Sequence, residues 1–509
     1  MKSYSSTSKR IAKNTMILYF RMLFLMAVSL YTSRVVLKAL GIEDYGIYNV
    51  VGGFVAMFSI ISGSLSASIT RFLNYEMGLG ISNRLKHIFS SSVTIQIFLS
   101  IIVILLAETI GLWFLNYKMQ IPIARLEATN WVFQLSLITF VVNLLSVPYN
   151  AVIIAHEKMS AFAYIGIFEG VSKLGIAFLI LNSSSDNLIL YAILMCVLSL
   201  IVRLVYGWYC GCNFAECKVS LTFDKCLLKQ IFSFAGWNFI GAIAGVLRDQ
   251  GGNVIINIFC GPAINAARGI SSQVNNAVLG FVTNFTMALN PQITQSYSSN
   301  NREYMKTLIF QGSKFSYFVL LFLSLPIIFN TPYILKIWLD DYPDYAVIFV
   351  RLTLILSMWE SIASPMSTGL LATGKIKWYQ ISVGGINLLN LPLSYIFLYF
   401  GFTPEIVLVV AIVLGQVTLF LRLMFIQKLL SFRVSEFFHT VYVKLILVSL
   451  VSCILPSFFS YVMSENFLSL MVSVVACLLG TTFGIYYFGC SQEEKMFVIG
   501  KIKRLIKIR

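Results

Sequence analysis

Long apolar segments follow one another along almost the whole chain, and they constrain the fold more than any other feature. Each is about 20 residues or longer, the length that an α-helix needs to cross the hydrocarbon core of a bilayer. Backbone polar groups find no water in lipid, so such segments must be helical. Only 11% of the residues are charged, against about 25% in a typical soluble protein. The sequence therefore predicts an all-α polytopic membrane protein with about fourteen transmembrane helices, near residues 15–37, 46–70, 88–115, 129–154, 159–181, 187–209, 231–258, 263–289, 307–330, 345–372, 377–400, 404–427, 441–462 and 466–489.

A pattern in the first half of the chain returns in the second. Pro148 in SVPYNAVIIAHEK and Pro365 in ASPMSTGLLATGK are 217 residues apart, and an alanine and a lysine follow each at the same spacing. Gly41 and Gly261 mark the same outer turn in the two copies. Six helices repeated in one orientation are typical of transporters whose two lobes rock about a central cavity. The predicted divisions are a basic tail (1–14), an N-terminal lobe (15–210), a cytoplasmic connection (211–230), a C-terminal lobe (231–428), two extra helices (429–490) and a second basic tail (491–509).

Positive charges are distributed unevenly along the chain, whose net charge is +16. If both termini are cytoplasmic, most of the 37 lysines and arginines lie in cytoplasmic segments, as the positive-inside rule requires. The charge therefore gives no reason to expect nucleic-acid binding. We expect the terminal KIKRLIKIR, residues 501–509, to lie on the anionic inner leaflet. The first apolar run is too long for a cleavable signal peptide, so we expect it to direct insertion itself.

The sequence contains no catalytic constellation. We find no phosphate-binding glycine loop, no His cluster with metal-ligand spacing and no large soluble segment. The cysteines Cys210, Cys212, Cys217 and Cys226 lie close together, but their spacing matches no standard zinc pattern, and reduced thiols are the favoured interpretation. Whether this cluster binds anything is left open. We expect a protein that is not an enzyme and has no cofactor, with an H⁺ or Na⁺ gradient left open as its driving force.

Polar side chains run in stripes through the two apolar segments of residues 235–301, on either side of a Cys-Gly-Pro turn. At about 100° per residue, those of the second segment fall mainly on one helix face. Polar groups inside a bilayer must face protein or water. Two neighbouring stripes with arginines therefore predict a hydrated cavity that receives something anionic. The stripes contain two arginines, an aspartate and several amides: Arg248, Asp249, Asn253, Arg268, Asn275 and Asn276.

Two other predicted helices carry charges. In the first helix, Arg21 and Arg34 are 13 residues apart, which places them on nearly opposite faces. Both would line one cavity only if the helix were kinked, and snorkelling towards the headgroups is the alternative. In the segment 159–181, Glu169 and Lys173 are four residues apart and share a face, so an internal ion pair is the most economical interpretation.

Five motifs support a family resemblance: LGIEDYGIYNVVGGF (40–54), GWNFIG (236–241), RDQGGN (248–253), FCGPAINAARGISSQV (259–274) and ALNPQITQSY (288–297). They are similar to those of the Wzx-type oligosaccharide flippases, polysaccharide biosynthesis proteins of the superfamily that also contains the MATE antiporters and the lipid II flippase MurJ. The resemblance implies two six-helix lobes plus two extra C-terminal helices. It also implies a flippase of the bacterial inner membrane that moves an undecaprenyl-diphosphate-linked oligosaccharide from the cytoplasmic to the periplasmic leaflet.

The resemblance is silent on whether the product is lipopolysaccharide O-antigen, capsule or exopolysaccharide. Candidate partners are a polysaccharide polymerase and chain-length proteins. We expect a monomer, because both lobes lie in one chain. Arginine suits the diphosphate because it is permanently charged and binds oxygens in pairs, while amides suit sugar hydroxyls. The candidate diphosphate ligands are Arg268 and Arg248, followed by Arg34 and Arg21. The candidate glycan ligands are Asn253, Gln273, Asn275 and Asn276. Asp249 and Glu169 are candidates for ion coupling.

Three other functions are left open. A MATE-like cation-coupled multidrug exporter would prefer acidic cavity residues, whereas the first helix has two arginines and no carboxylate. A lipid II flippase is a close variant of the first interpretation. However, Arg21 and Arg34 stand at other distances from Gly41 than the first-helix arginines of MurJ proteins do, so those roles are not carried over. A membrane scaffold for polysaccharide synthases would have little use for buried arginines.

Overall fold

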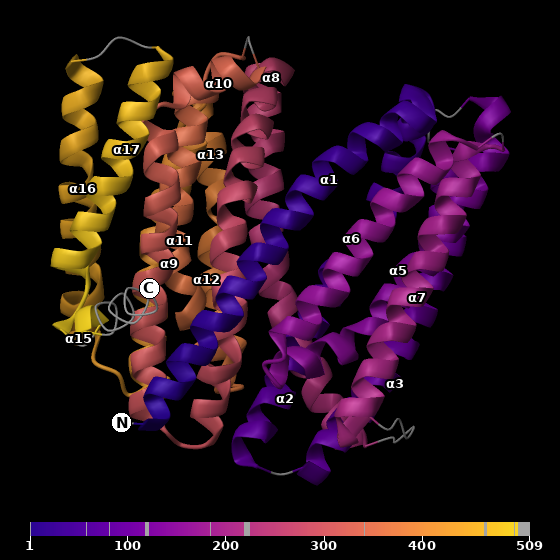
Figure 1. Cartoon of the computed structure of the whole chain (residues 1–509), viewed down its shortest axis with the longest axis horizontal. Coiled ribbons are helices and arrows are strands. Elements are labelled where there is room, and N and C mark those ends of the chain that lie inside the picture. Colours follow the sequence, from indigo (N-terminus) through magenta and orange to yellow (C-terminus); the bar gives the residue numbers. More distant parts are fainter. Residues whose placement is uncertain are drawn as a thin grey trace, which may run out of the picture. The chain divides into compact units, whose positions relative to one another are not determined.

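The computed structural model is helical, and its described residues contain no β-strand (Figure 1). Twelve helices in the described part of the chain are long and apolar enough to cross a membrane. Each overlaps one of the predicted spans, so the prediction of an all-α polytopic membrane protein is confirmed. The structure describes residues 2–56, 59–80, 82–117, 122–183, 185–217, 224–339, 342–462, 466–492 and 494–496.

Two of the predicted spans, 46–70 and 263–289, are not among these twelve. Both are nevertheless helical where they are described. Residues 46–70 run through the end of one helix and the start of the next, and residues 57 and 58 between them are not described. Residues 263–289 lie within one long helix, but their polar stripe lowers the mean hydropathy. The two missing spans are thus the corresponding helices of the two repeats.

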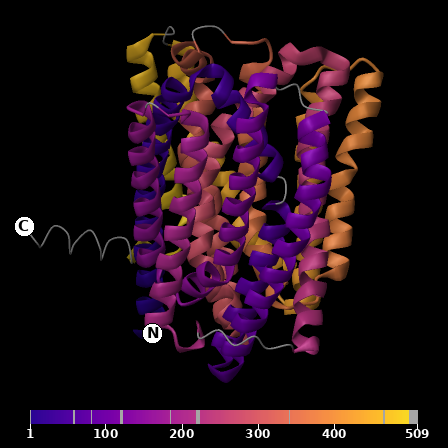
Figure 2. The ribbon, with the colours of Figure 1, turned by 90° about the vertical axis from the view of Figure 1, so that its right-hand side faces the viewer.

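The chain divides into two compact units. The first comprises Met1–Ala242 and Thr294–Asn300, and the second Ile243–Ile293 and Asn301–Arg509. In the first unit, α1 packs along α6 and α5, while α5 also contacts α2, α3 and α7. Figure 2 shows these helices, which are drawn in indigo to purple. The helices of the first unit are α1 (Lys2–Ala56), α2 (Ser59–Leu79), α3 (Ser82–Leu106), α4 (Leu112–Tyr117), α5 (Leu126–Ala155), α6 (Met159–Leu181) and α7 (Asn187–Asn213), with a π-helical turn (Ala107–Gly111) and two 3₁₀ turns (Ile123–Arg125 and Ala215–Cys217).

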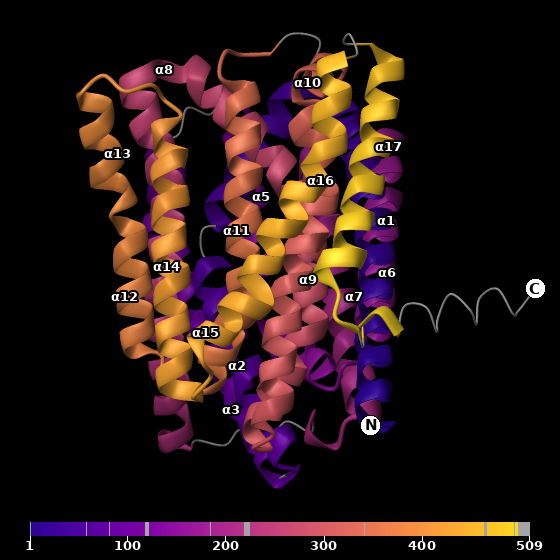
Figure 3. The same cartoon turned by 90° about the vertical axis from the view of Figure 1, so that its left-hand side faces the viewer.

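Helix α8 (Lys225–Ser298) contributes to both units. In the second unit, α9 packs against α11, and α11 also packs against α14. Figure 3 shows α12 and α13 side by side with α14, and α16 paired with α17. The remaining helices are α9 (Arg302–Phe329), α10 (Thr331–Leu339), α11 (Ala346–Ala372), α12 (Lys377–Leu388), α13 (Asn390–Tyr399), α14 (Ile406–Leu430), α15 (Val434–Phe437), α16 (Val443–Val462) and α17 (Phe467–Gly484), with π-helical turns at Phe438–Tyr442 and Ile485–Gly489.

One glycine interrupts the helical backbone of α1, and another interrupts that of α8. Gly41 has φ 79° and ψ 172°, and Gly261 has φ 81° and ψ 178°. Side chains with a Cβ rarely adopt this conformation, whereas glycine adopts it without steric cost. The two turns therefore have the same backbone, which confirms that these glycines mark equivalent positions in the two copies.

A buried ion pair within the second unit joins the segment that follows α17 to α9. The Lys314 ammonium, on α9, donates to both oxygens of Glu494 at 2.9 and 2.6 Å and to the Gly489 carbonyl at 3.2 Å. Only 6% of the Lys314 side chain and 11% of the Glu494 side chain are exposed. All three ammonium hydrogens are thus satisfied, as a buried charge requires.

Candidate anion-binding site

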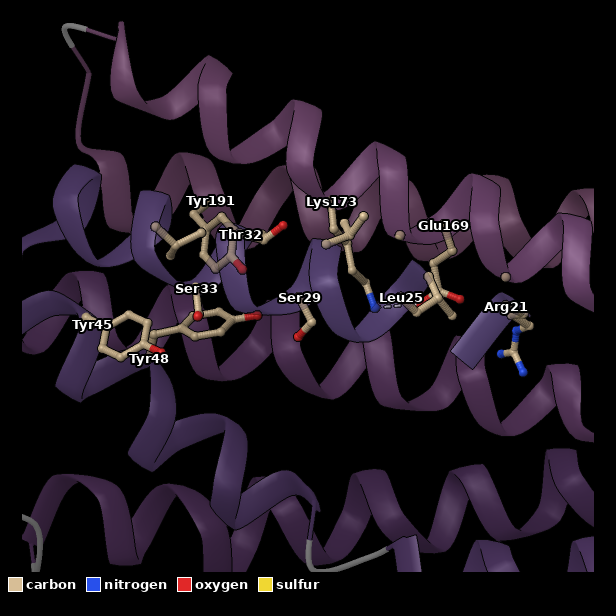
Figure 4. A pocket seen from close by; sticks show the side chains of 14 residues that line it. Arg21, Leu25, Ser29, Thr32, Ser33, Tyr45, Tyr48, Glu169, Lys173 and Tyr191 are labelled. Atoms are coloured by element: carbon tan, nitrogen blue, oxygen red, sulfur yellow. Dashed lines mark hydrogen bonds and ion pairs between the residues drawn. The ribbon is translucent and has the colours of Figure 1, made fainter. Parts of the chain in front are cut away.

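A cavity of about 370 Å³ lies within the first unit, between α1, α6 and α7 (Figure 4). Helix α1 lines it from Arg21 to Val36 and again after the Gly41 turn, with Tyr45 and Tyr48. Helix α6 contributes Glu169, Lys173 and two glycines, and α7 contributes Tyr191. The cavity is therefore built mainly on regular helices, which hold its side chains in fixed places.

The charges of this cavity lie towards one end, near Arg21. Lys173 Nζ is 2.6 Å from Glu169 Oε1, which confirms the ion pair predicted from their spacing. Arg21 has no ion pair with a described residue, and its guanidinium lies 4.4 Å from the centre of the Phe162 ring. Its Nε is buried and donates no hydrogen bond to the described residues. A side chain at Gly166 would collide with this guanidinium, so the glycine makes room for it. The charged lining sums to one net positive charge.

The other end of the cavity presents hydroxyl groups and aromatic rings. The Tyr48 and Tyr191 rings are 4.8 Å apart, so two phenol groups lie together at this end. Thr32 Oγ1 is buried with no hydrogen-bond partner in the described part of the chain. Arg34, by contrast, is exposed and does not line the cavity. The structure thus separates Arg21 from Arg34, as their spacing predicted.

In the second unit, the two arginines of α8 lie against one face of α11. Arg248 Nε donates to Asp249 Oδ1 at 2.9 Å, and its Nη1 donates to Glu360 Oε1. Arg268 Nη1 donates to the Thr353 hydroxyl at 2.8 Å. Thr353 and Glu360 are seven residues apart on α11 and therefore share a face.

The two arginines differ in how their charge is balanced. Arg248 is held by two carboxylates, and only 12% of its side chain is exposed. Arg268 has hydroxyl partners and no ion pair with a described residue, although Asp249 and Arg248 are close enough to act on its charge. Arg268 is therefore the α8 arginine that is better able to accept an external anion.

Sequence reasoning did not select Glu360 and Thr353 as site residues. The signal in the sequence was the carboxylate Glu360 on one span and Arg248 on another. The sequence does not show that the helices that carry them face each other.

The predicted amide ligands, all on α8, have different surroundings. Asn253 Nδ2 donates to Gln250 Oε1 at 3.2 Å, and its Oδ1 is buried with no partner among the described residues, as is Oδ1 of Asn275. Gln273 and Asn276 are exposed. No hydrogen bond among the described residues joins any two of the four predicted glycan ligands.

The cysteines of the predicted cluster are not arranged as metal ligands where they are described. Cys210 and Cys217 are buried and Cys212 is exposed, while the side chain of Cys226 lies outside the described residues. A hydrogen bond with Cys210, together with burial, raises the pKa of the Cys217 thiol, which disfavours the thiolate that binds metals. No group of three or more His, Cys, Asp or Glu side chains in the described part of the chain is placed to hold a metal ion. The terminal basic stretch 501–509 lies outside the described residues.

Comparisons with known proteins agree on the family and the fold. A family model described as polysaccharide biosynthesis protein matches residues 11–297, and the MatE model matches residues 231–396. No curated protein sequence matches the chain. A Vibrio cholerae MATE transporter in its bent form superposes with a TM-score of 0.70 at 17% identity, over 85% of this chain and 98% of that one. An outward-facing multidrug resistance MATE transporter of the MOP superfamily gives a TM-score of 0.73 at 10% identity, over 84% and 96%. At these identities the likeness shows the fold alone.

Proposed function

Because the chain belongs to the polysaccharide biosynthesis protein family, we propose that it is a flippase for undecaprenyl-diphosphate-linked oligosaccharide repeat units. The substrate moves from the cytoplasmic to the periplasmic leaflet of the bacterial inner membrane, with both protein termini in the cytoplasm, and it supplies the synthesis of a surface polysaccharide. Transport proceeds by alternating access of the two predicted lobes, because the helices repeat in a parallel arrangement typical of such transporters.

The observation that best supports this proposal is Arg268, a cation within a predicted span that has no ion pair with a described residue. Its Nη1 is oriented by hydroxyl groups, and it has further N–H donors for a phosphate oxygen. Placing a cation within a transmembrane span costs free energy, because the cation loses its hydration. Such residues are therefore rare in spans and usually have a function. We therefore assign the diphosphate to Arg268. Arg248 can also bind it when the ligand replaces one of its carboxylate partners.

A MATE-like multidrug exporter is the second candidate, and the fold supports it equally well. Its cationic substrates would require carboxylates that are free to bind them. In the two sites, however, Glu169, Glu360 and Asp249 are each paired with a lysine or an arginine. Charge therefore favours an anionic substrate. Coupling to H⁺ or Na⁺ through Asp249 or Glu169 remains part of the proposal, as do a monomeric state and the polymerase and chain-length partners.

The test is translocation of a lipid-diphosphate-linked oligosaccharide in proteoliposomes. The variants are Arg268→Gln and Arg248→Gln. Lys336→Gln is the matched control, because it also removes one positive charge and this exposed lysine lies on α10, away from Arg248 and Arg268 in the sequence. Loss of a hydrogen bond to a charged group costs about 1.5–3 kcal/mol, so we expect Arg268→Gln to lower transport at limiting substrate at least about tenfold. Wild-type protein that moves organic cations and no diphosphate-linked glycan would refute the proposal.

A further inference from the structure

The cavity of the first unit has a polarity that the assignment of the diphosphate to the second unit leaves unexplained. Its charged end holds Arg21, Glu169 and Lys173, and its other end holds hydroxyl-bearing side chains (Figure 4). Two of its polar atoms, Arg21 Nε and Thr32 Oγ1, are buried with no hydrogen-bond partner among the described residues. Buried polar groups are normally satisfied. Neither atom is open to the cavity in this conformation, so a ligand with an oxygen acceptor for Arg21 and a polar group for Thr32 would satisfy them once the two side chains turn.

The spacing of these two groups limits the size of the ligand. Arg21 and Thr32 are 11 residues apart on α1, or about 16 Å along a helix that rises about 1.5 Å per residue. One sugar ring is too short to contact both, whereas a short oligosaccharide is long enough. The cavity volume of about 370 Å³ lies within the range of ligand sites, about 300–1,000 Å³, so the cavity itself has room for a few sugar rings.

The charge balance selects the anion. Arg21 and Lys173 contribute two positive charges and Glu169 one negative charge, so the lining matches a monoanion. A sugar carboxylate is a monoanion, whereas the diphosphate that joins glycan to lipid carries a larger charge. Arginine binds a carboxylate in a bidentate manner, and tyrosine rings and hydroxyls suit the apolar faces and hydroxyl edges of sugars.

We propose that the cavity between α1, α6 and α7 is a glycan subsite that binds an acidic sugar of the repeat unit, with the sugar carboxylate on Arg21 and neighbouring sugar hydroxyls on Thr32 and the tyrosine end. This inference rests on the proposed flippase function and extends it, because it names an acidic glycan as the preferred substrate. Glu169 is paired with Lys173 and forms no ion pair with Arg21.

The test compares cellobiouronic acid with cellobiose, which differ by a carboxylate in place of a hydroxymethyl group, and with inorganic diphosphate. Binding to the full-length protein in nanodiscs is followed by thermal stabilisation, since a ligand that binds the folded state raises the unfolding temperature. We expect the acidic disaccharide to bind at least about tenfold more tightly than cellobiose, the range that a hydrogen bond to a charged group supports.

Three variants locate the site. Arg21→Gln should remove the preference for the acidic disaccharide, and Thr32→Val should weaken binding of the corresponding acidic trisaccharide, which is long enough to contact both residues, about twofold to tenfold, the range of a neutral hydrogen bond. Thr32→Val removes a buried hydroxyl that has no partner in the described part of the chain, so the variant should fold. Lys38→Gln, a change at an exposed residue of α1 outside the cavity, should bind as the wild type does.

Other outcomes overturn the inference. Arg21-dependent binding of inorganic diphosphate, without binding of the acidic sugar, would make the cavity a phosphate site. Equal binding of the two disaccharides, or binding insensitive to Arg21 and Thr32, would remove the subsite. Translocation of a neutral lipid-linked glycan in the same preparation would leave the flippase function intact in either case. Acidic-sugar binding by a protein that moves no lipid-linked glycan would instead refute the flippase function and keep the subsite.

Discussion

Glu360→Gln tests whether a phosphate competes with the protein's own carboxylates for Arg248. Glu360 accepts a hydrogen bond from Arg248 Nη1 and joins α11 to α8. The glutamine keeps the shape of the side chain but removes its charge, and Asp249 still holds Arg248 Nε at 2.9 Å. Arg248 then has one carboxylate partner in place of two.

The expected effects on stability and on binding have opposite signs. A hydrogen bond to a charged group contributes about 1.5–3 kcal/mol, and the Glu360 side chain is 36% exposed, so we use the lower limit. Glu360→Gln should therefore lower the free energy of unfolding by about 1.5 kcal/mol. The same free energy no longer opposes an incoming phosphate, and since about 1.4 kcal/mol corresponds to a factor of ten, diphosphate affinity should rise up to about tenfold.

The assay is a titration of the protein in nanodiscs with geranyl diphosphate, alongside thermal unfolding. Glu303→Gln is the matched control, because it removes the same charge from an exposed position on α9. Weaker binding by Glu360→Gln, equal to that of Arg248→Gln, would refute the competition and show that Glu360 orients Arg248 for the ligand. Unchanged binding in both variants would show that Arg248 does not contact the diphosphate.

Further substitutions test the fold and its stability. Gly41→Ala and Gly261→Ala should each lower the free energy of unfolding by about 1–3 kcal/mol, because each places a Cβ on a backbone that only glycine adopts readily; thermal unfolding without a shift would contradict this. Glu494→Gln leaves the Lys314 ammonium buried without a full counter-charge and should cost about 3–5 kcal/mol, whereas replacing both residues by methionine should cost less than either single change in a double-mutant cycle. Burial raises the pKa of Glu157, in the α5–α6 turn, above 4.5. The folded protein then binds a proton more tightly than the unfolded chain, so stability should rise as the pH falls through the folded pKa, and Glu157→Gln should abolish that slope in unfolding measured against pH.

The architecture could be predicted because hydrophobicity and helix length determine it locally. The least certain spans, 46–70 and 263–289, are those in which polar stripes dilute the apolar signal. The equivalence of Gly41 and Gly261 was also predictable, because a turn that requires a positive φ restricts the residue type at that position. These features depend on short stretches of sequence, which the chain displays directly.

The sites were only partly predictable, because their contacts join distant segments. The Glu169–Lys173 pair follows from helical spacing alone. Arg248 and Glu360, in contrast, are separated by 112 residues, and their pairing requires knowing that α8 packs against α11. That Arg21 Nε has no partner among the described residues is equally invisible in sequence, because it depends on what surrounds α1 on every side.

The internal repeat relates residues of the two sites by their positions in the sequence. Gly41 and Gly261 differ by 220 in residue number, and the same offset relates Val28 to Arg248 and Tyr48 to Arg268. Val28 and Tyr48 both line the cavity of the first unit. The two α8 arginines therefore occupy the positions that face a cavity in the other copy, which favours a ligand-facing role for them over one in helix packing alone. The same backbone presents hydroxyl and apolar groups in one copy and guanidinium groups in the other. The proposed substrate has a glycan part and a diphosphate part, which would be a reason for two copies of one fold to diverge in this way.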